Sequence, residues 1–526
     1  MRLKNSTTII AFVLFLFHIS SLSGQKINTA QIDSIVHASM NMMTHAGVAV
    51  AVIQDGKVIH SKGYGIASDT SGEKVDENTL FAIASNSKSF TAAALAILVD
   101  EGKLEWHDKV IEYIPEFKMY DNYVTENFNI IDLLTHRSGL GLGAGDLLFF
   151  PDGSDFGIQD VLNSFQYQKP TSAFRTKYDY DNLLYVVAGE VISRISGMTW
   201  AEFVELRIMN PLEMNRSAGV YQNLKDKSNL AIPHSTANGK IKELKTYLKN
   251  DGTLGAAGGI YSSVKDMSNW LLLQLNEGKY GTDSTKQIFS AKSQHIMWKP
   301  HTNINFTSKP QDTYKSHFRA YGLGWFISDK NGYITMEHTG GLPGMLSSTL
   351  VIPELNCAVV VLTNADPGGY SFWSIRAEIT DLLLGVERKD WISMMKSRIE
   401  NSESKGDSVV NAVWAIASKT KTNHLDLNNF VGLYKDDWFG KVDISLKEGE
   451  LWFSSQRSPK LSGQMYFYQA NTFAVKWMYQ DMPCDAFAMF NLDENGKSLG
   501  IKMKGISPNI DFSFDFQDLD FKRITE

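Results

Sequence analysis

Hydrophobic residues near the start of the chain follow first a helical and then a strand spacing. The segment from Ile32 to Met43 predicts a helix. A strong hairpin signal comes from two β-rich runs, Gly47–Ile53 and Val58–Ile59, which flank Asp55-Gly56. The next run, Phe90–Val99, is apolar on every face. A helix without a polar face is typical of the interior of a large core, so we expect this segment to be buried.

The middle of the chain is predicted to be helical. A helix begins near Asn182, because apolar residues recur at i, i+3 and i+4 as far as Ile195, and Gly197 ends it. Helices and loops are expected throughout residues 199–330. Within this region the glycine run Gly255–Gly259 is expected to be flexible and to precede a helix at Val264–Asn276.

Strand periodicity returns after residue 330. Strands at both ends of the first 385 residues, with helices between them, predict an antiparallel sheet closed by N- and C-terminal segments. The expected fold class is therefore α+β, with a helical subdomain between the strands. The later strands are predicted at Tyr333–His338, Ser347–Ile352 and Ala358–Thr363, and a helix at Ser371–Leu384 would cover the sheet.

The last 140 residues change in character. Residues 388–424 are charged, show little apolar pattern and are predicted to form a helical connector. Residues 425–526 contain short, regularly spaced strands, with turns at Glu448-Gly449 and Asn495-Gly496, and predict a small antiparallel β-barrel or sandwich. The last predicted strand contains the alternating residues Phe512, Phe514 and Phe516.

The N-terminus has the order of a secretory signal. Arg2 and Lys4 precede an apolar run from Ile9 to Ile19, and small and polar residues follow up to Gln25. Residues 1–24 are therefore predicted to be a signal peptide, which places the protein in the periplasm or outside the cell. The alternative is an uncleaved anchor, but the run is shorter than the ~20 residues that span a bilayer. No later stretch is apolar enough, so the mature chain is expected to lack an integral membrane span.

Composition excludes several classes of function. The chain has 526 residues, with 51 Lys and Arg against 58 Asp and Glu, and its net charge of −7 disfavours nucleic acid as a partner. Two cysteines, Cys357 and Cys484, are too few for a disulfide scaffold or a cysteine-rich metal site. They fall in different predicted domains, so no intrachain disulfide is expected. The oligomeric state is left open.

A first candidate for chemistry is Ser85-Asn86-Ser87-Lys88, just before the buried helix. Ser85 and Lys88 are three residues apart, so they share one helical face. A serine needs a neighbouring base to act as a nucleophile, and burial lowers the pKa of a lysine so that it can lose its proton. The alternative is a helix cap with a surface lysine, because Ser-x-x-Lys is a common chance pattern.

A second candidate is Tyr180-Asp181-Asn182, at the junction between a loop and a helix. The phenol of Tyr180 is suited to proton transfer, and the amide of Asn182 to binding a substrate carbonyl or orienting Lys88. The alternative is that Asp181 or Asn182 only caps the helix while Tyr180 packs.

A third candidate is His338-Thr339-Gly340-Gly341, at the end of a predicted strand. His338 and Thr339 offer polar groups along a strand edge, and the glycines let a ligand approach the backbone. The Gly341 N–H is a candidate oxyanion donor beside the Ser85 N–H. The alternative is a simple strand-ending turn.

Taken together, the order and spacing of the three motifs resemble the serine β-lactamase and penicillin-binding-protein superfamily, most closely the class C β-lactamase, D-Ala-D-Ala carboxypeptidase and esterase branch. The resemblance extends over about residues 30–385, so that residues 25–387 would be the catalytic domain. Residues 425–526 resemble the lipocalin-like β domain appended to many of these hydrolases. Further phrases that carry the resemblance are Phe81–Ser85, Ile131–Gly139, Pro211–Met214, Ala257–Ser262 and Tyr321–Trp325.

The resemblance implies a role for each motif residue. Ser85 would be the acylated nucleophile, Lys88 its base and Tyr180 a general acid/base. The substrate-binding residues would be Asn182, His338, Thr339, Gly340 and Gly341. One departure is that His338 stands where β-lactamases usually have lysine, which resembles the D-amino-acid peptidases of this branch and argues against efficient β-lactam hydrolysis.

The sequence therefore predicts an exported serine hydrolase that cleaves amide or ester bonds of small molecules or D-amino-acid peptides, without a metal or organic cofactor. One alternative is an acyltransferase, in which an alcohol or amine replaces water as the acceptor of the acyl group. Another is a catalytically silent periplasmic binding module that has kept the fold.

Overall fold

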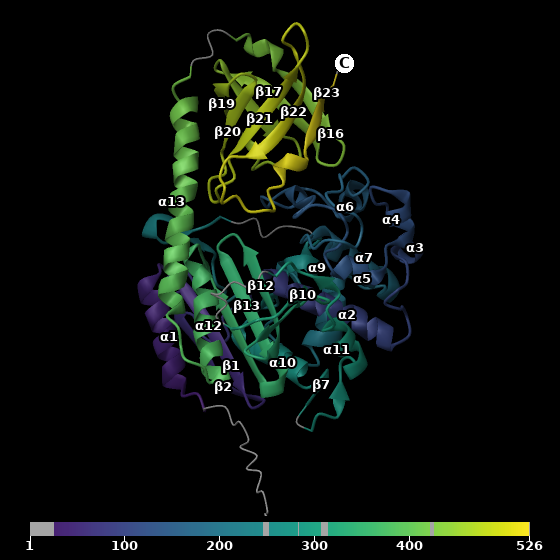
Figure 1. Ribbon diagram of the computed structural model, residues 1–526, viewed down its shortest axis with the longest axis vertical. Helices are drawn as coiled ribbons and strands as arrows, with labels where there is room; N and C mark the ends of the chain where they lie inside the picture. The colour runs from purple at the N-terminus through teal and green to yellow at the C-terminus, as the bar shows by residue number, and fades with distance from the viewer. Residues whose placement is uncertain (1–25, 246–251, 282, 307–313, 421–424, 525–526) are drawn as a thin grey trace, which may run out of the picture.

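The structure, a computed structural model, describes residues 26–524 apart from 246–251, 282, 307–313 and 421–424. A large unit of sheet and helices lies next to a smaller barrel, and one long helix runs beside both (Figure 1). The predicted signal peptide, residues 1–24, lies outside the described residues. Within those ranges, no helix is both long and apolar enough to cross a membrane.

An antiparallel sheet organises the larger unit. Its strands follow the order β2-β1-β14-β13-β12-β11-β10-β9, eight in the described part of the chain. The N-terminal hairpin pairs with a C-terminal strand, and Val50 of β1 lies opposite Val361 of β14. This arrangement confirms the predicted α+β class. The strands are β1 (Gly47–Gln54), β2 (Lys57–Gly65), β9 (Thr302–Asn303), β10 (Arg319–Tyr321), β11 (Phe326–Lys330), β12 (Tyr333–Leu342), β13 (Met345–Ile352) and β14 (Cys357–Thr363).

Helices cover both faces of the sheet. On one face lie α1 (Thr29–Met42) and α12 (Ser371–Leu384), and on the other lies α10 (Val264–Leu275). Side chains of β1 alternate between these layers, so that Val50 packs with α1 and α12 while Ala51 packs in the cluster that contains α10. Every residue of β1 is buried, because a strand between two helix layers has no solvent face.

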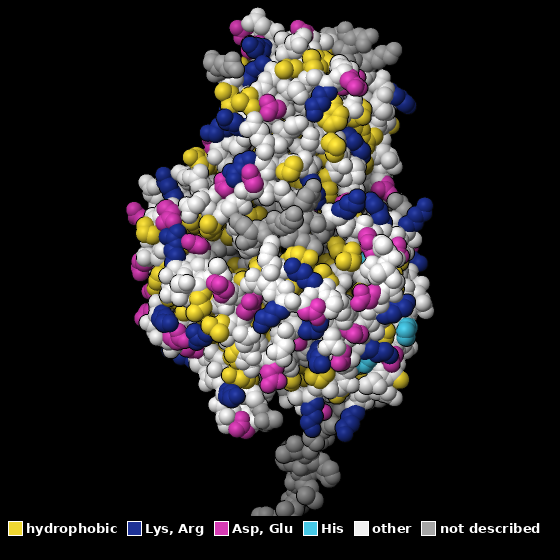
Figure 2. Space-filling model, turned by 180° about the vertical axis from the view of Figure 1, so that it is seen from behind, with side chains coloured by type: hydrophobic (Ala, Val, Ile, Leu, Met, Phe, Trp, Pro, Cys, Tyr) yellow, Lys and Arg dark blue, Asp and Glu magenta, His cyan; other side chains and the backbone are white. Residues whose placement is uncertain are grey.

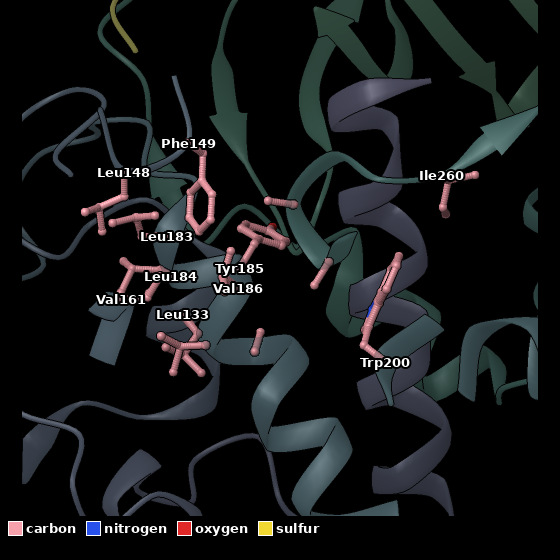
Figure 3. Packing of buried hydrophobic residues seen from close by; sticks show 14 of the residues in the cluster. Leu133, Leu148, Phe149, Val161, Leu183, Leu184, Tyr185, Val186, Trp200 and Ile260 are labelled. Atoms are coloured by element: carbon pink, nitrogen blue, oxygen red, sulfur yellow. The ribbon is translucent and has the colours of Figure 1, made fainter. Parts of the chain in front are cut away.

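The predicted buried helix is α2 (Ser87–Asp100). Its residues from Ser87 to Leu98 are all buried, as its uniformly apolar sequence indicates. Neighbouring helices enclose it, among them α7 (Leu183–Ser196), α9 (Gly255–Gly258) and α11 (Ala291–Met297). Figure 3 shows part of this core, where side chains of α7 lie near Leu148 and Phe149 and near Val161 of α6 (Ile158–Ser164). Because α2 is packed by neighbouring helices, its first turn, which carries the serine motif, is held in place.

The C-terminal part forms a closed antiparallel barrel, as predicted. Helix α13 (Trp391–Ala417) leads to it, contacting α1 and α12 and packing Val413 and Ala417 against the outside of the barrel. The barrel strands are β16 (Gly432–Asp436), β17 (Gly440–Lys447), β18 (Glu450–Ser455), β19 (Ser462–Gln469), β20 (Thr472–Trp477), β21 (Ala486–Leu492), β22 (Ser498–Gly505) and β23 (Asp520–Arg523).

One predicted strand of the barrel is wrong. Residues 506–519 form a loop between β22 and β23 that ends in a short 3-10 helix, Phe516–Asp518. Phe514 and Phe516 are buried in the barrel core, which accounts for the apolar alternation. Phe512 instead leaves the barrel, and its backbone meets Gly143 of the larger unit. We call residues 506–519 the β22–β23 loop.

The surface and the cysteines agree with the composition. Figure 2 shows basic and acidic side chains intermixed on the face seen from behind, so the net charge is not gathered into one patch there.

Cys357 and Cys484 are both free and buried, as the prediction of no intrachain disulfide requires.

Candidate active site

Ser85 lies in a strained turn that is tied to the sheet. Ala84, directly before it, has φ of +48°, a conformation that residues other than glycine adopt rarely and mostly at functional sites. The Ser347 hydroxyl of β13 donates to the Ile83 carbonyl at 2.7 Å, and the Asn86 amide donates to the Ser347 hydroxyl at 2.8 Å. Hydrogen bonds from the sheet on both sides of Ser85 therefore hold the turn that presents its hydroxyl.

Gly340 is required by the protein's own backbone. A Cβ at this position would lie 2.3 Å from the Ile83 carbonyl oxygen and 2.5 Å from the Ser347 hydroxyl. β12 passes directly over the Ser85 turn, so the packing of the protein itself already requires this glycine, which also lines the cleft. Gly341 differs, since a Cβ there would meet only the Leu346 side chain at 3.4 Å and its backbone lines the cleft.

Lys88 is completely buried beside Ser85. Its Nζ lies 3.2 Å from the Ser85 Oγ, and it also donates to the Asn182 Oδ1 at 2.7 Å and to the Ala257 carbonyl at 2.8 Å. Ala257 belongs to the glycine run Gly255–Gly259, whose predicted flexibility is wrong: most of the run forms the buried helix α9. The run is rich in small residues because α9 packs closely against α2 and α7.

The surroundings of Lys88 favour its neutral form. Burial lowers the pKa of Lys88 to about 7, while the carboxyl groups of Asp146 and Asp181 act in the opposite direction. A substantial fraction of Lys88 is therefore neutral near neutral pH and able to accept a proton from Ser85.

Tyr180 lies beside Lys88, whose Nζ is 4.8 Å from the centre of the Tyr180 ring. Burial raises the pKa of Tyr180 well above its usual value, so the side chain stays a neutral phenol. The interaction of its buried hydroxyl with Ser85 acts in the opposite direction and lowers the pKa. The ring of His136, whose Nδ1 accepts the Asp181 N–H at 3.0 Å, lies 4.1 Å from the Tyr180 ring and supports it. The Tyr180 hydroxyl is therefore held next to Ser85, in a residue that lines the cleft.

His338 is neutral and buried. Its Nδ1 lies 2.6 Å from the Thr339 carbonyl, which only accepts, so this nitrogen carries the proton and Nε2 accepts from the Tyr321 hydroxyl at 2.9 Å. Burial and the charge of Lys88 lower the pKa of His338 to about 3. His338 therefore gives the strand edge no positive charge.

A cavity of about 430 Å³ opens above these groups. Its lining includes Ser85, the predicted binding residues Asn182, His338, Thr339, Gly340 and Gly341, and Tyr180. Arg319 of β10, whose guanidinium lies 4.9 Å from the centre of the Phe326 ring, lines it as well. Asp366 and Asp511 bring two carboxyl groups to the same cavity. The cavity is thus of a size for a small molecule and carries charges of both signs.

The barrel contributes one wall of this cavity. Asp511, Phe512 and Ser513 of the β22–β23 loop line it, together with Met482 from the barrel. The Phe512 ring lies edge-on to the Tyr180 ring, with 5.8 Å between centroids. Arg457 of the barrel holds the two units together through Asp160, with 2.6 Å between Nη1 and Oδ1. The predicted site residues therefore meet in one cleft, and the cleft is shared between the units.

Two separate family models match the larger unit and the barrel. A family model described as beta-lactamase matches residues 32–377. The chain belongs to the beta-lactamase family. A second model, described as a domain of unknown function (DUF3471), matches residues 417–523 of this beta-lactamase family member.

Relatives of this family member include hydrolases and a penicillin-binding-protein homologue. Unguisins hydrolase ungD' of Aspergillus campestris is 28% identical over 68% of this chain and 66% of its own length. Protein flp of Staphylococcus aureus is 25% identical over 64% of this chain and 62% of its own length. The chain thus spans a little under two thirds of both. The octameric penicillin-binding protein homologue from Pyrococcus abyssi shares the fold, with a TM-score of 0.59 and 19% identity over 94% of this chain and 100% of the homologue.

Several residues in and around the cleft are outside the sequence prediction. His136 lies in Ile131–Gly139, a phrase that carries the family resemblance, and so a signal for it was present. Arg319 lies on a three-residue strand and Asp146 in a glycine-rich loop, where no periodic pattern marks them. Phe512 was assigned to a barrel strand, and only the contact between the units reveals its place.

Proposed function

We propose that this protein is an exported serine hydrolase that cleaves amide or ester bonds of small molecules or D-amino-acid peptides through a Ser85 acyl-enzyme. The observation that carries the proposal is the buried Lys88, whose Nζ lies 3.2 Å from the Ser85 Oγ and whose pKa is lowered to about 7. A relative named as a hydrolase of unguisins supports hydrolysis as the reaction.

In the acylation step, the Ser85 Oγ attacks the carbonyl carbon while neutral Lys88 takes the Ser85 proton. The N–H groups of Ser85 and Gly341 stabilise the oxyanion that forms. The carbonyl bond to nitrogen or oxygen then breaks, and the leaving group takes a proton from the Tyr180 hydroxyl, which Lys88 reprotonates. The opposite pKa directions of Lys88 and Tyr180 support this assignment of base and acid.

In the deacylation step, water attacks the Ser85 ester. Lys88, neutral again, takes a proton from the water through Tyr180, and the hydroxide oxygen bonds to the ester carbonyl carbon. The bond from that carbon to the Ser85 Oγ then breaks, the carboxylic acid leaves, and Lys88 returns the proton to the Ser85 Oγ. One water molecule is consumed in each cycle. If an alcohol or amine binds in place of the water, the same intermediate gives acyl transfer.

The charges of the cleft favour a small polar substrate. Arg319 offers a positive charge for a carboxylate of the substrate, a role that the neutral His338 cannot fill. Asp366 and Asp511 offer acceptors for an amino group. Charges of both signs in one cleft of about 430 Å³ fit an amino-acid amide or a short peptide better than an apolar ester.

A substrate panel tests this proposal. The panel contains D-aminoacyl amides, D-Ala-D-Ala peptides, the cephalosporin nitrocefin and short-chain esters, each assayed with and without a candidate alcohol acceptor. We expect the highest kcat/KM with an amide or peptide that carries a free amino or carboxyl group, and slow turnover of nitrocefin. Turnover of apolar esters alone would contradict the substrate class, and transacylated product with every acceptor would favour the acyltransferase.

Phe512 is expected to limit the size of the acyl group. Its side chain is 38% exposed and stands over Tyr180, so Phe512→Ala enlarges the cleft without removing a group that takes part in the chemistry. We expect the ratio of kcat/KM for a bulky acyl group over a small one to rise about tenfold. The matched control is Met478→Ala, an exposed barrel residue that is not part of the cavity lining. An equal ratio in both variants would contradict a role for Phe512 in selectivity.

The proposed domain limits are a signal peptide at 1–24, a catalytic domain at 25–387, a connector at 388–424 and a β domain at 425–526. The family-model matches at 32–377 and 417–523 support the two larger units. The basic and apolar order of the first 24 residues supports export to the periplasm or the medium.

A further inference from the structure

Four buried side chains connect the barrel to the active-site lysine. The Ser513 hydroxyl of the β22–β23 loop donates to the Asp146 Oδ2 at 3.0 Å. The same oxygen accepts the Asn182 Nδ2 at 2.8 Å, and the Asn182 Oδ1 accepts the Lys88 Nζ at 2.7 Å. All four residues are at least nine-tenths buried. We call this series the Ser513–Lys88 chain.

Asp146 determines which end of the Asn182 amide faces Lys88. The Asp146 Oδ2 accepts from the Asn182 Nδ2, and above its pKa the carboxylate has no donor to offer. In that form Asp146 keeps the Asn182 NH₂ group towards itself and the carbonyl oxygen towards the Lys88 Nζ. A reversed amide would present its NH₂ group to Lys88 and leave a buried donor without an acceptor, which is unfavourable. The orientation of Asn182 thus depends on Asp146.

The barrel holds Asp146 from two sides. Ser513 contacts its carboxylate, and both carboxylate oxygens of Asp515 accept backbone N–H groups of the turn that carries Asp146, from Gly145 at 2.7 Å and from Leu147 at 2.9 Å. Asp146 Oδ1 makes no hydrogen bond within the described residues, so Oδ2 makes the contacts that orient the carboxylate. The position of Asp146 therefore depends on the barrel as well as on the larger unit.

We propose that the barrel, through Ser513 and Asp146, positions Asn182 and Lys88 for the acyl-transfer reaction. Neither Ser513 nor Asp146 contacts Ser85 in this arrangement, so both are positioning residues. The inference rests on the proposed function, in which Lys88 is the base. It assigns to the C-terminal barrel a part in the chemistry beyond covering the cleft.

The residues of the Ser513–Lys88 chain also shift one another's pKa. Burial raises the pKa of Asp146 to about 7, while the hydrogen bonds from Asn182 and Ser513 and the charge of Lys88 oppose the rise. The carboxylate in turn favours the protonated form of Lys88. The other titratable groups that act on Asp146 or Lys88 are Tyr180, Asp181, Asp511, Asp515, His136 and His338.

The test is the pH dependence of covalent labelling by a fluorophosphonate. Lys88 accepts a proton only when neutral, so the labelling rate of the full chain is expected to rise with pH through about 7. Asp146→Asn keeps an acceptor for Asn182 but removes the charge that favours protonated Lys88, so the midpoint moves to lower pH by about one unit. Ser513→Ala removes a donor to the carboxylate, which raises the pKa of Asp146, and the midpoint moves in the same direction by less.

Two further variants separate positioning from a merely structural role. Ser513→Thr keeps the hydroxyl and is expected to restore the wild-type midpoint. Arg457→Gln removes the contact with Asp160 between the units without touching the Ser513–Lys88 chain, and its midpoint is expected to stay in place. Thermal unfolding is measured for every variant, so that a loss of folding is recognised as such.

The outcomes distinguish this inference from the proposed function. A wild-type protein that the fluorophosphonate does not label at any pH contradicts the proposed function itself. A labelled wild type whose midpoint is the same in Asp146→Asn and Ser513→Ala contradicts the positioning role alone. A midpoint that moves equally in Arg457→Gln also contradicts it, because any loosening of the barrel would then have the same effect.

Discussion

Replacing Ser85 with alanine is expected to reduce kcat/KM by a factor on the order of 10⁶, because nucleophile and base act as one unit. The Ser85 hydroxyl lies 3.2 Å from the Lys88 Nζ, and the turn that carries it is fixed by hydrogen bonds to β13. Alanine leaves that turn intact, so the protein is expected to fold and to bind substrate. Steady-state kinetics on the best substrate of the panel measures the effect.

The matched control for this variant is Ser89→Ala. Ser89 is a buried serine one turn further along α2, and its hydroxyl donates to the Asn86 carbonyl rather than facing Lys88. We expect turnover within about threefold of the wild type for a hydroxyl outside the site. Comparable losses in both variants would mean that the effect comes from the packing of α2 and would contradict the assignment of Ser85.

Replacing Lys88 with methionine is expected to lower the acylation rate by roughly 10³-fold or more, since removal of the base leaves Ser85 without activation. Methionine has a similar length and no charge. Methionine gives no donor to the Asn182 Oδ1 and the Ala257 carbonyl, so the midpoint of thermal unfolding is expected to fall by roughly 5 °C or more. Single-turnover acylation and a thermal melt measure the two quantities.

The Lys88 prediction separates a catalytic from a structural lysine. A structural lysine would leave the acylation rate of the folded fraction close to that of the wild type, whatever the change in melting temperature. The alternative base is a Tyr180 phenolate, and the raised pKa of Tyr180 argues against it.

Short-range patterns in the sequence predicted the parts of the structure that depend on local periodicity. The apolar run Phe90–Val99 predicted a buried helix, and the run before Asp55-Gly56 predicted a hairpin, because each signal is complete within about ten residues. Strands β10 and β11 did not show such a signal. They have three and five residues and include charged positions. β11 pairs with β12 and β10 pairs with β11, so each depends on a neighbouring strand.

In the candidate site, too, contacts between residues close in the sequence could be predicted, and contacts between distant residues could not. Ser85 and Lys88 are three residues apart, so their proximity follows from helical geometry once the helix is predicted. The contact between Ser513 and Asp146 joins residues that are 367 positions apart, and no local pattern indicates it. Phe512 could not be predicted either. Its alternation with Phe514 is typical of a strand, and it lies in the cleft because the barrel contacts Gly143 of the larger unit.

Formation of the covalent intermediate on Ser85 is tested by locating the site of a covalent adduct. The full chain is treated with a fluorophosphonate, its intact mass is measured, and the modified peptide is mapped by tandem mass spectrometry. We expect one adduct per chain, located on Ser85 and missing from Ser85→Ala. An adduct on another residue, or equal labelling of the wild type and Ser85→Ala, would contradict it.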